Sequence, residues 1–230
     1  MAMRRLQASV AAVQGMWLRS TVKFAPPAVG PTHGSIGTTA RPPLRIAVLG
    51  DSTAAGCGVH THDEGFTGSL AREISARTLR PVEWQVAGQF GATARRIRYR
   101  LLPTLDTELD AAVLLAGGND VMSRRTPGEW RADLDAITDD LMERAGHVVI
   151  AAVPPFALFP AVPPALGRYL SERAAELDEV SRRICAVRPC TTWVPMTELP
   201  RPEHFAGDRF HLSAAGYHRW ARVIADHLPL

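Results

Sequence analysis

The sequence predicts an α/β fold built on a central, mostly parallel sheet. From Leu44 onward, short apolar runs alternate with longer segments whose apolar residues have helical spacing. Several of the short runs are rich in β-branched residues, which favours strands. Strands that alternate with helices form parallel sheets whose two faces are both covered by helices. We therefore expect buried strands between two helical layers.

Five strands are expected, and each is too short to be a core helix. They are the runs 44–49, 82–86, 111–115, 148–153 and 192–194. Between the strands lie three segments whose apolar residues have helical spacing. They are marked by Leu70 and Ile74, by Leu134, Ile137 and Leu141, and by Leu170, Ala174, Leu177 and Ile184. A last helix should begin after Ser213, a residue type that favours the N-cap position.

Length and composition indicate an ordinary globular protein. The 230 residues suffice for one domain of about 180 residues and an additional segment. No run approaches the roughly 18 apolar residues of a membrane span. A net charge of +3 is too small to indicate a nucleic-acid partner. The three cysteines lack CxxC spacing, which favours reduced thiols and a cytoplasmic location.

Residues 1–43 are expected to precede the domain, which then spans 44–230. The first residues carry two arginines and a weakly apolar stretch, as a secretory signal does, but Gln7 and Gln14 interrupt it. We expect a short amphipathic helix that packs on the domain, on a partner or on a membrane surface, so export and membrane association stay open. Its apolar face would hold Leu6, Val10, Val13 and Trp17. The stretch "APPAVGPTHGSIGTTARPP" is expected to be an irregular linker ending at Pro43.

Polar and glycine-rich loops follow the expected strands. The loops after the first three are "GDST", "AGQFGAT" and "GGND", and "GDRFHLS" precedes the last helix. In parallel sheets, loops at the carboxyl ends of the strands face a common crevice. We therefore expect Ser52, Gly91 and Asn119 to lie near the pair formed by Asp208 and His211.

These residue types are the parts of acyl transfer by a serine. The Ser52 hydroxyl needs a base, His211, and that histidine needs an acceptor such as Asp208 to fix its tautomer. The tetrahedral intermediate needs hydrogen-bond donors aimed at its oxyanion. The backbone N–H groups of Ser52 and Gly91 and the side-chain amide of Asn119 are the candidates, and glycine permits a close approach of the backbone.

The four blocks "GDST", "GAT", "GGND" and "DRFHLS", in this order, resemble the SGNH hydrolases, also called GDSL esterases and lipases. The resemblance covers roughly residues 44–230. It implies a three-layer α/β/α, flavodoxin-like fold and serine ester hydrolysis without a metal or an organic cofactor. It also implies the same roles as above: Ser52 as nucleophile, Gly91 and Asn119 as oxyanion donors, His211 as base and Asp208 as its partner.

Three positions depart from the family pattern without removing a catalytic group. Val86 stands where the second block often begins with Asn, and Phe90 stands where a small polar residue often precedes the glycine. One local hydrogen bond is then missing and the pocket wall is more apolar. Thr53 occupies a position where many members have Leu or Ile.

Other residues near the motifs have simpler roles. Asp51 and Asp120 are expected to bind backbone amides in their turns, as acidic turn residues do. The D-x-x-H spacing favours His211 as base over His204 and His218, while His204, Phe90 and Phe205 are candidates for the substrate pocket. Cys57 is expected to be a small buried residue, because it has no base or oxyanion site of its own.

The expected function is hydrolysis of a carboxylic ester through an acyl-enzyme on Ser52. A short or medium acyl chain is expected, and lipid and acetylated-sugar esters stay open, as do acyl transfer and thioesterase or lysophospholipase activity, because fold does not choose among them. A non-catalytic or nucleotide-binding α/β protein is the alternative of another class. Against it, "GDSTAAGCG" has neither GK[ST] nor G-x-G-x-x-G. The oligomeric state stays open.

Overall fold

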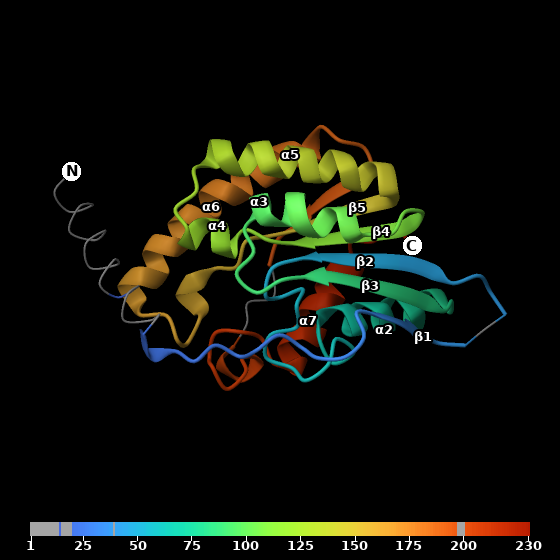
Figure 1. The fold of residues 1–230 in the computed structure, drawn as a ribbon, viewed down its shortest axis with the longest axis horizontal. Helices are drawn as coiled ribbons and strands as arrows, with labels where there is room; N and C mark the ends of the chain where they lie inside the picture. The colour runs from blue at the N-terminus through green and yellow to red at the C-terminus, as the bar shows by residue number, and fades with distance from the viewer. Residues whose placement is uncertain (1–13, 15–19, 39, 197–200) are drawn as a thin grey trace.

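The fold is a six-stranded sheet between two layers of helices (Figure 1). The structure is a computed structural model that describes residues 14, 20–38, 40–196 and 201–230. The strands are β1 (His33–Ile36), β2 (Leu44–Gly50), β3 (Val82–Gly88), β4 (Leu109–Leu115), β5 (Ala145–Ala151) and β6 (Thr191–Val194). Their order across the sheet is β1-β3-β2-β4-β5-β6. β1 runs antiparallel to β3, and all the other pairs are parallel.

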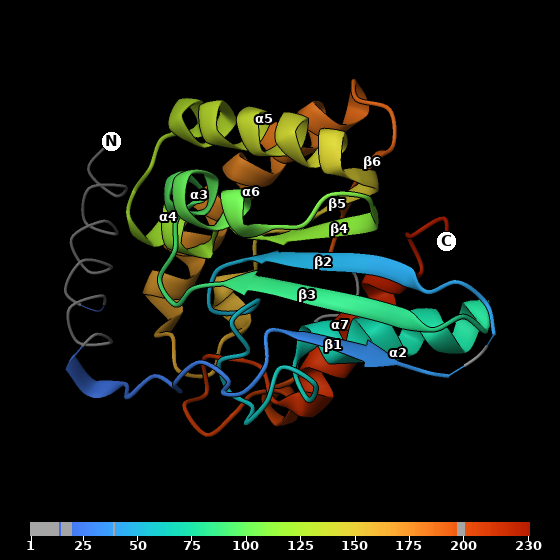
Figure 2. The same cartoon turned by 45° about the vertical axis from the view of Figure 1, so that its right-hand side comes forward.

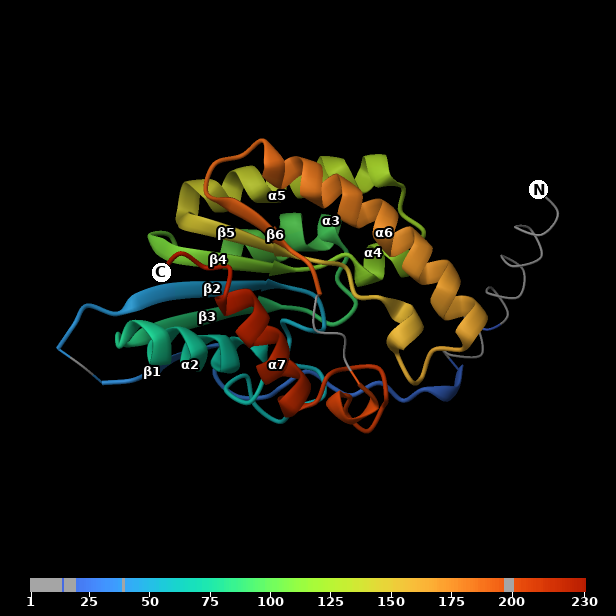
Figure 3. The same ribbon diagram turned by 180° about the vertical axis from the view of Figure 1, so that it is seen from behind.

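Two groups of helices cover the two faces (Figures 2 and 3). α2 (Phe66–Thr78) and α7 (Ala214–Ala225) lie on one face. The other face carries α3 (Ala94–Arg96), α4 (Gly118–Met122), α5 (Pro127–Arg144) and α6 (Pro164–Ala186). A π-helical turn, Ile97–Leu101, continues α3 and leads into η2 (Leu102–Thr104). Two further 3-10 turns are η3 (Phe156–Leu158) and η4 (Pro202–His204).

The sheet divides the core into two apolar layers. Leu49, Leu114 and Ile150 pack against α3 to α6, whereas their neighbours Val48, Val113 and Val149 pack against α2 and α7. Successive side chains of a strand point to opposite faces, so strands covered on both sides need apolar residues at nearly every position. This explains the uninterrupted apolar runs of the sequence.

The predicted three-layer α/β/α architecture is confirmed. Each of the five expected strands is present, with ends within three residues of the expected ones. The helices marked by apolar spacing are α2, α5 and α6, and the last one is α7, with Ser213 at its N-cap. Among the parallel strands the chain moves from β2 to β3 on one side and then to β4 on the other. The carboxyl end of β2 is therefore a topological switch point, where ligands bind in such sheets.

The expected irregular linker is wrong for residues 33–36, which form β1. This edge strand is short, and Gly34 lies opposite Trp84. A Cβ atom at Gly34 would lie 2.3 Å from the Trp84 ring, so the position requires a glycine. A four-residue strand with glycine lacks the apolar alternation by which strands are recognised, and only its pairing with β3 reveals it.

The expected amphipathic face at Leu6, Val10, Val13 and Trp17 lies outside the described residues. Within the described chain, no helix is both long enough and apolar enough to cross a membrane.

Candidate active site

Ser52 lies in a helical turn directly after β2. The Asp51 carbonyl accepts a hydrogen bond from the Ala55 N–H at 2.9 Å, and the Ser52 carbonyl accepts one from the Cys57 N–H at 3.0 Å. The last strand residue must be glycine, because a Cβ atom at Gly50 would lie 2.1 Å from the Leu115 carbonyl oxygen. The turn therefore follows the strand closely and presents Ser52 to a cavity at the sheet edge.

Asp51 braces this turn, as the sequence predicted. One of its carboxylate oxygens accepts a hydrogen bond from the Thr53 N–H at 3.0 Å, and the other accepts one from the Asn119 amide at 3.3 Å. Burial raises the pKa of Asp51 to about 6, although the Thr53 N–H and the nearby His211 act in the opposite direction. Asp51 thus joins the serine turn to the loop that carries Asn119.

The pair formed by Asp208 and His211 is built within one turn. Oδ1 of Asp208 accepts hydrogen bonds from the backbone N–H groups of Phe210 at 3.0 Å and His211 at 2.9 Å. Oδ2 lies 2.6 Å from Nδ1 of His211. The D-x-x-H spacing therefore lets one carboxylate fix both the turn and the imidazole. Burial opposes ionisation of Asp208, but the hydrogen bonds outweigh it and hold its pKa well below the usual range.

Three candidate hydrogen-bond donors, the N–H groups of Ser52 and Gly91 and the Asn119 amide, belong to residues that line the cavity together with His211. Gly91 has a φ of +74°, and a Cβ there would meet no atom within 4 Å, so its backbone is open on that side. Asn119 also lines the cavity. Within the described chain, the backbone N–H groups of Ser52 and Gly91 have no hydrogen-bond acceptor. This arrangement can bind an anionic oxygen.

Ser52 and His211 both line the cavity. In the part of the chain that the structure describes, no hydrogen bond joins the Ser52 hydroxyl to the imidazole. Nδ1 of His211 faces Asp208, which leaves Nε2 as the nitrogen that could accept the serine proton. Catalytic hydrogen bonds are often long before substrate binds and tighten in the complex.

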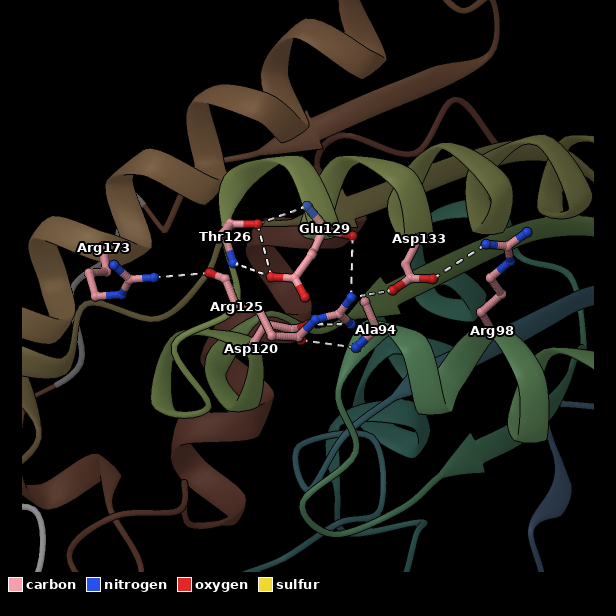
Figure 4. Close-up of polar contacts among 8 residues, drawn as sticks. All are labelled: Ala94, Arg98, Asp120, Arg125, Thr126, Glu129, Asp133 and Arg173. Carbon is pink, nitrogen blue, oxygen red and sulfur yellow. Dashed lines mark hydrogen bonds and ion pairs between the residues drawn. The ribbon is translucent and has the colours of Figure 1, made fainter.

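A buried ionic clamp joins the loops that carry Gly91 and Asn119 (Figure 4). Asp120 is fully buried and accepts a hydrogen bond from the Ala94 N–H at 2.9 Å, three residues after Gly91. Its other oxygen pairs with Arg125 at 3.3 Å, and Arg125 also pairs with Asp133 of α5 at 2.7 Å. Burial raises the pKa of Asp120 to about 6, against the Ala94 N–H and the charge of Arg125.

The cavity has a volume of about 530 Å³ and a mainly apolar wall. It extends from Ser52 between α4, α6 and the loop after β5. The larger apolar side chains along it are Phe24, Phe90, Met122, Phe156, Phe159, Leu166, Tyr169, Leu170, Met196, Phe210 and Trp220. Phe90 is 43% exposed, which places it at an accessible part of the wall, as expected from the sequence. Such a volume is typical of small-molecule sites.

The expectation that His204 and Phe205 line the pocket is wrong: the cavity wall, as far as the structure describes it, contains neither. Phe205 is buried behind the wall against Phe159, with ring centroids 5.3 Å apart. His204 closes the η4 turn, since its Nδ1 accepts a hydrogen bond from the Arg201 N–H at 3.1 Å. The positions of both side chains depend on the conformation of the loop before α7, which the spacing of residues in the sequence does not reveal.

The surroundings of His218 and Cys57 argue against His218 as the base and against Cys57 as the nucleophile. The His218 side chain is 57% exposed on α7, where its Nε2 lies 3.7 Å from Glu73. Cys57 is fully buried, and burial, with the nearby Asp51 and Asp208 charges, raises the pKa of its thiol to about 12. A thiol that is not ionised is a poor nucleophile.

Sequence reasoning missed the part of the N-terminal segment that reaches the site. Phe24 lines the cavity, and its ring centroid lies 5.8 Å from that of His211. The N–H of Ala25 donates to Oδ2 of Asp208 at 2.8 Å. A lone phenylalanine before "APP" was the only signal, and it is too weak to place a residue in a distant site.

Comparison with known proteins decides the family. The model of the GDSL-like lipase/acylhydrolase family matches residues 48–219, which is more than half of the chain. The chain belongs to this family. The predicted membership of the SGNH or GDSL family is thereby confirmed.

The relatives of this GDSL-type chain are distant. It is 25% identical over 184 residues to a GDSL-like esterase of Mycobacterium tuberculosis, an alignment that covers 76% of this chain and 58% of that protein. Two similar solved structures, each with a TM-score of 0.60, are a carbohydrate acetylesterase from Sinorhizobium meliloti, at 18% identity, and an aryl esterase of M. smegmatis, at 19%. Each alignment covers 80% of this chain and 97% of the other. These structural likenesses support the fold.

Proposed function

We propose that the protein hydrolyses carboxylic esters that carry a short or medium apolar acyl chain, through an acyl-enzyme on Ser52. The observation that carries the proposal is the single cavity onto which Ser52, His211 and Asn119 converge. Family membership supports ester chemistry in general. The apolar wall of the cavity supports an acyl chain as the group that it binds.

In the proposed first step, Oγ of Ser52 attacks the ester carbonyl carbon as its proton passes to Nε2 of His211. The Asp208 carboxylate stabilises the imidazolium that forms. The oxyanion accepts hydrogen bonds from the N–H groups of Ser52 and Gly91 and from the Asn119 amide. Collapse breaks the bond to the alcohol oxygen, which leaves with the proton from His211.

Water completes the proposed reaction. His211 takes a proton from a water molecule as its oxygen attacks the acyl carbon, and the second tetrahedral intermediate uses the same donors. Its collapse releases the carboxylic acid and returns the proton to Ser52. Only a neutral imidazole accepts these protons, so the rate should fall in acid.

Substitution of the nucleophile tests the proposal. The Ser52→Ala variant should lose turnover of p-nitrophenyl butyrate, because removal of a catalytic serine costs about 10⁶-fold in rate. A fluorophosphonate should label the unmodified chain at Ser52 and leave the variant unlabelled. The exposed Ser35, on the edge strand β1 and outside the cavity lining, provides a matched Ser→Ala control that should keep full turnover. Turnover retained by a folded Ser52→Ala variant would exclude the mechanism.

Variations of the same assay distinguish ester hydrolysis from thioester hydrolysis, from acyl transfer and from a non-catalytic chain. A panel of acyl lengths and of oxygen and thiol leaving groups, with Ser52→Ala as blank, gives the substrate class. Product analysis with an added alcohol distinguishes acyl transfer from hydrolysis. A folded chain with neither turnover nor labelling would favour the non-catalytic alternative.

A further inference from the structure

The segment from Phe24 to Val29, here called the strap, crosses the molecule beside the proposed site. In Figure 1 it runs in blue along the lower edge, past the red loop between η4 and α7. That loop carries Asp208 and His211. The strap therefore brings residues from before the domain into contact with groups almost two hundred positions later in the sequence.

The strap donates a hydrogen bond directly to the catalytic carboxylate. The Ala25 N–H lies 2.8 Å from Oδ2 of Asp208, the same oxygen that lies 2.6 Å from Nδ1 of His211. The Asp208 side chain is 2% exposed, so no bulk water replaces this donor readily. An unpaired lone pair on a buried carboxylate is costly, and a second fixed donor limits rotation of the group.

The strap also covers the imidazole. The Phe24 ring lies edge-on to that of His211, at 5.8 Å and 76°, and to that of Phe210, at 5.0 Å and 71°. Phe90 approaches from the next loop, with centroids 6.0 Å from Phe24 and 5.9 Å from His211. Three aromatic rings thus restrict the imidazole, and Phe24 closes part of the cavity wall.

Backbone contacts fix the strap on the loop that follows Ser52. The Ala28 N–H donates to the Ala55 carbonyl at 2.9 Å, and the Val29 N–H donates to the His60 carbonyl at 2.9 Å. Val29 also forms a parallel bridge with Thr61. One end of the strap is therefore anchored on the loop that follows Ser52, while Ala25 at the other end binds Asp208, the partner of His211.

We propose that the strap is part of the active site, with Ala25 and Phe24 as positioning residues that hold Asp208 and His211 in their reactive geometry. Through its two contacts the strap links the serine turn to the base. This inference rests on the proposed function for its kinetic consequences, whereas its structural consequence can be measured without any turnover.

The Ala25→Pro variant tests the contact, because proline has no N–H to donate. Residue 25 already precedes a proline, so its backbone is already biased toward an extended conformation. The matched control is Ala25→Ser, which keeps the N–H. With p-nitrophenyl acetate, kcat of Ala25→Pro should fall roughly 10- to 100-fold, as expected for the loss of a hydrogen bond to a charged group. KM should stay within about twofold, because a positioning role acts on the chemical step.

A second readout is the proton NMR signal of the His211 Nδ1–H, which its short hydrogen bond to Asp208 moves far downfield. It should shift or broaden in Ala25→Pro and keep its position in Ala25→Ser. Equal kcat values and an unshifted signal in a folded Ala25→Pro variant would overturn the proposal. If the unmodified chain hydrolyses no ester, the proposed function fails, while the NMR comparison still decides whether the strap positions Asp208.

A second pair of variants applies if Ala25→Pro does not fold. Ala28→Pro removes the anchor bond to Ala55 and leaves the Asp208 contact chemically possible, and Ala28→Gly keeps the anchor donor. Ala28→Pro should show the same shift in the signal and the same direction of change in kcat. Behaviour identical to Ala28→Gly in both readouts would overturn the proposal.

Discussion

The single side chain of Asp208 stabilises a turn and also binds the imidazole of His211. Its Oδ1 closes the turn through two backbone N–H groups, and its Oδ2 is shared by His211 and Ala25. All of these contacts favour the ionised carboxylate, and together they hold the pKa of Asp208 below the usual range in spite of burial. Asp208 therefore stays ionised at neutral pH.

The Asp208→Asn variant should lose activity without losing the fold. An amide at this position keeps much of the turn but cannot stabilise an imidazolium, and the loss in kcat should be about 10⁴-fold, with KM little changed. Steady-state kinetics with p-nitrophenyl butyrate at pH 8 measures it.

Glu203→Gln, an exposed acid-to-amide change in η4, is the matched control and should keep full activity. An Asp208→Asn variant as active as this control would remove Asp208 from the mechanism.

One ionic clamp joins the helices α3, α4 and α5. Asp120 of α4 accepts a hydrogen bond from the N–H of Ala94, the first residue of α3. It also forms an ion pair with Arg125, which forms a second ion pair with Asp133 of α5. α4 has only five residues, too few to be stable as an isolated helix. The position of Asn119 within it therefore depends on the clamp rather than on helix propensity.

The burial of Asp120 makes the stability of the fold depend on pH. The pKa of Asp120 is about 6 in the folded chain, against an ordinary value of 3.8, so between these values the folded state binds more protons than the unfolded state. The free energy of unfolding should therefore fall as the pH rises from about 4 to about 6 through this group. Asp120→Asn should make that part of the profile less steep, although Asp51 and Asp178 contribute in the same direction, as measured by urea unfolding at pH 4, 5, 6 and 7.

The exposed Asp106, which lies outside the clamp, offers a matched Asp→Asn comparison. Identical slopes in the two variants would show that Asp120 does not titrate in this range.

The cavity is a property of the whole molecule. Its wall takes Trp220 from the α7 side of the sheet, Met122 and Tyr169 from the opposite side, and Phe24 from the strap. Segments that share no local sequence pattern thus form one cavity wall. Their arrangement at the sheet edge follows from the chain reversing direction around β2.

A larger side chain in this wall should shorten the preferred acyl chain. Met122→Trp should lower the ratio of kcat/KM for p-nitrophenyl octanoate to that for the acetate by about tenfold or more, since each methylene in an apolar pocket is worth about 1–3 kcal/mol. Met122→Leu conserves volume and should leave the ratio within about twofold. An unchanged ratio in Met122→Trp would place the acyl chain elsewhere.

The parallel strands, the helices between them and the candidate site residues could all be predicted from the sequence. These depend on local signals: the apolar runs of doubly covered strands, the "GDST" turn after the first of them, and the spacing from Asp208 to His211. Sheet geometry then brings the loops to one edge, so Ser52, Gly91 and Asn119 could be placed together without coordinates.

Only the tertiary structure decided that residues 33–36 are a strand, that Phe205 and His204 lie outside the cavity and that Phe24 and Ala25 reach the site. Each of these depends on a partner distant in sequence: Trp84 for Gly34, Phe159 for Phe205, and Asp208 for Ala25. A single backbone N–H or an isolated ring carries no periodicity, and contacts between remote segments form only once the chain has closed around its core.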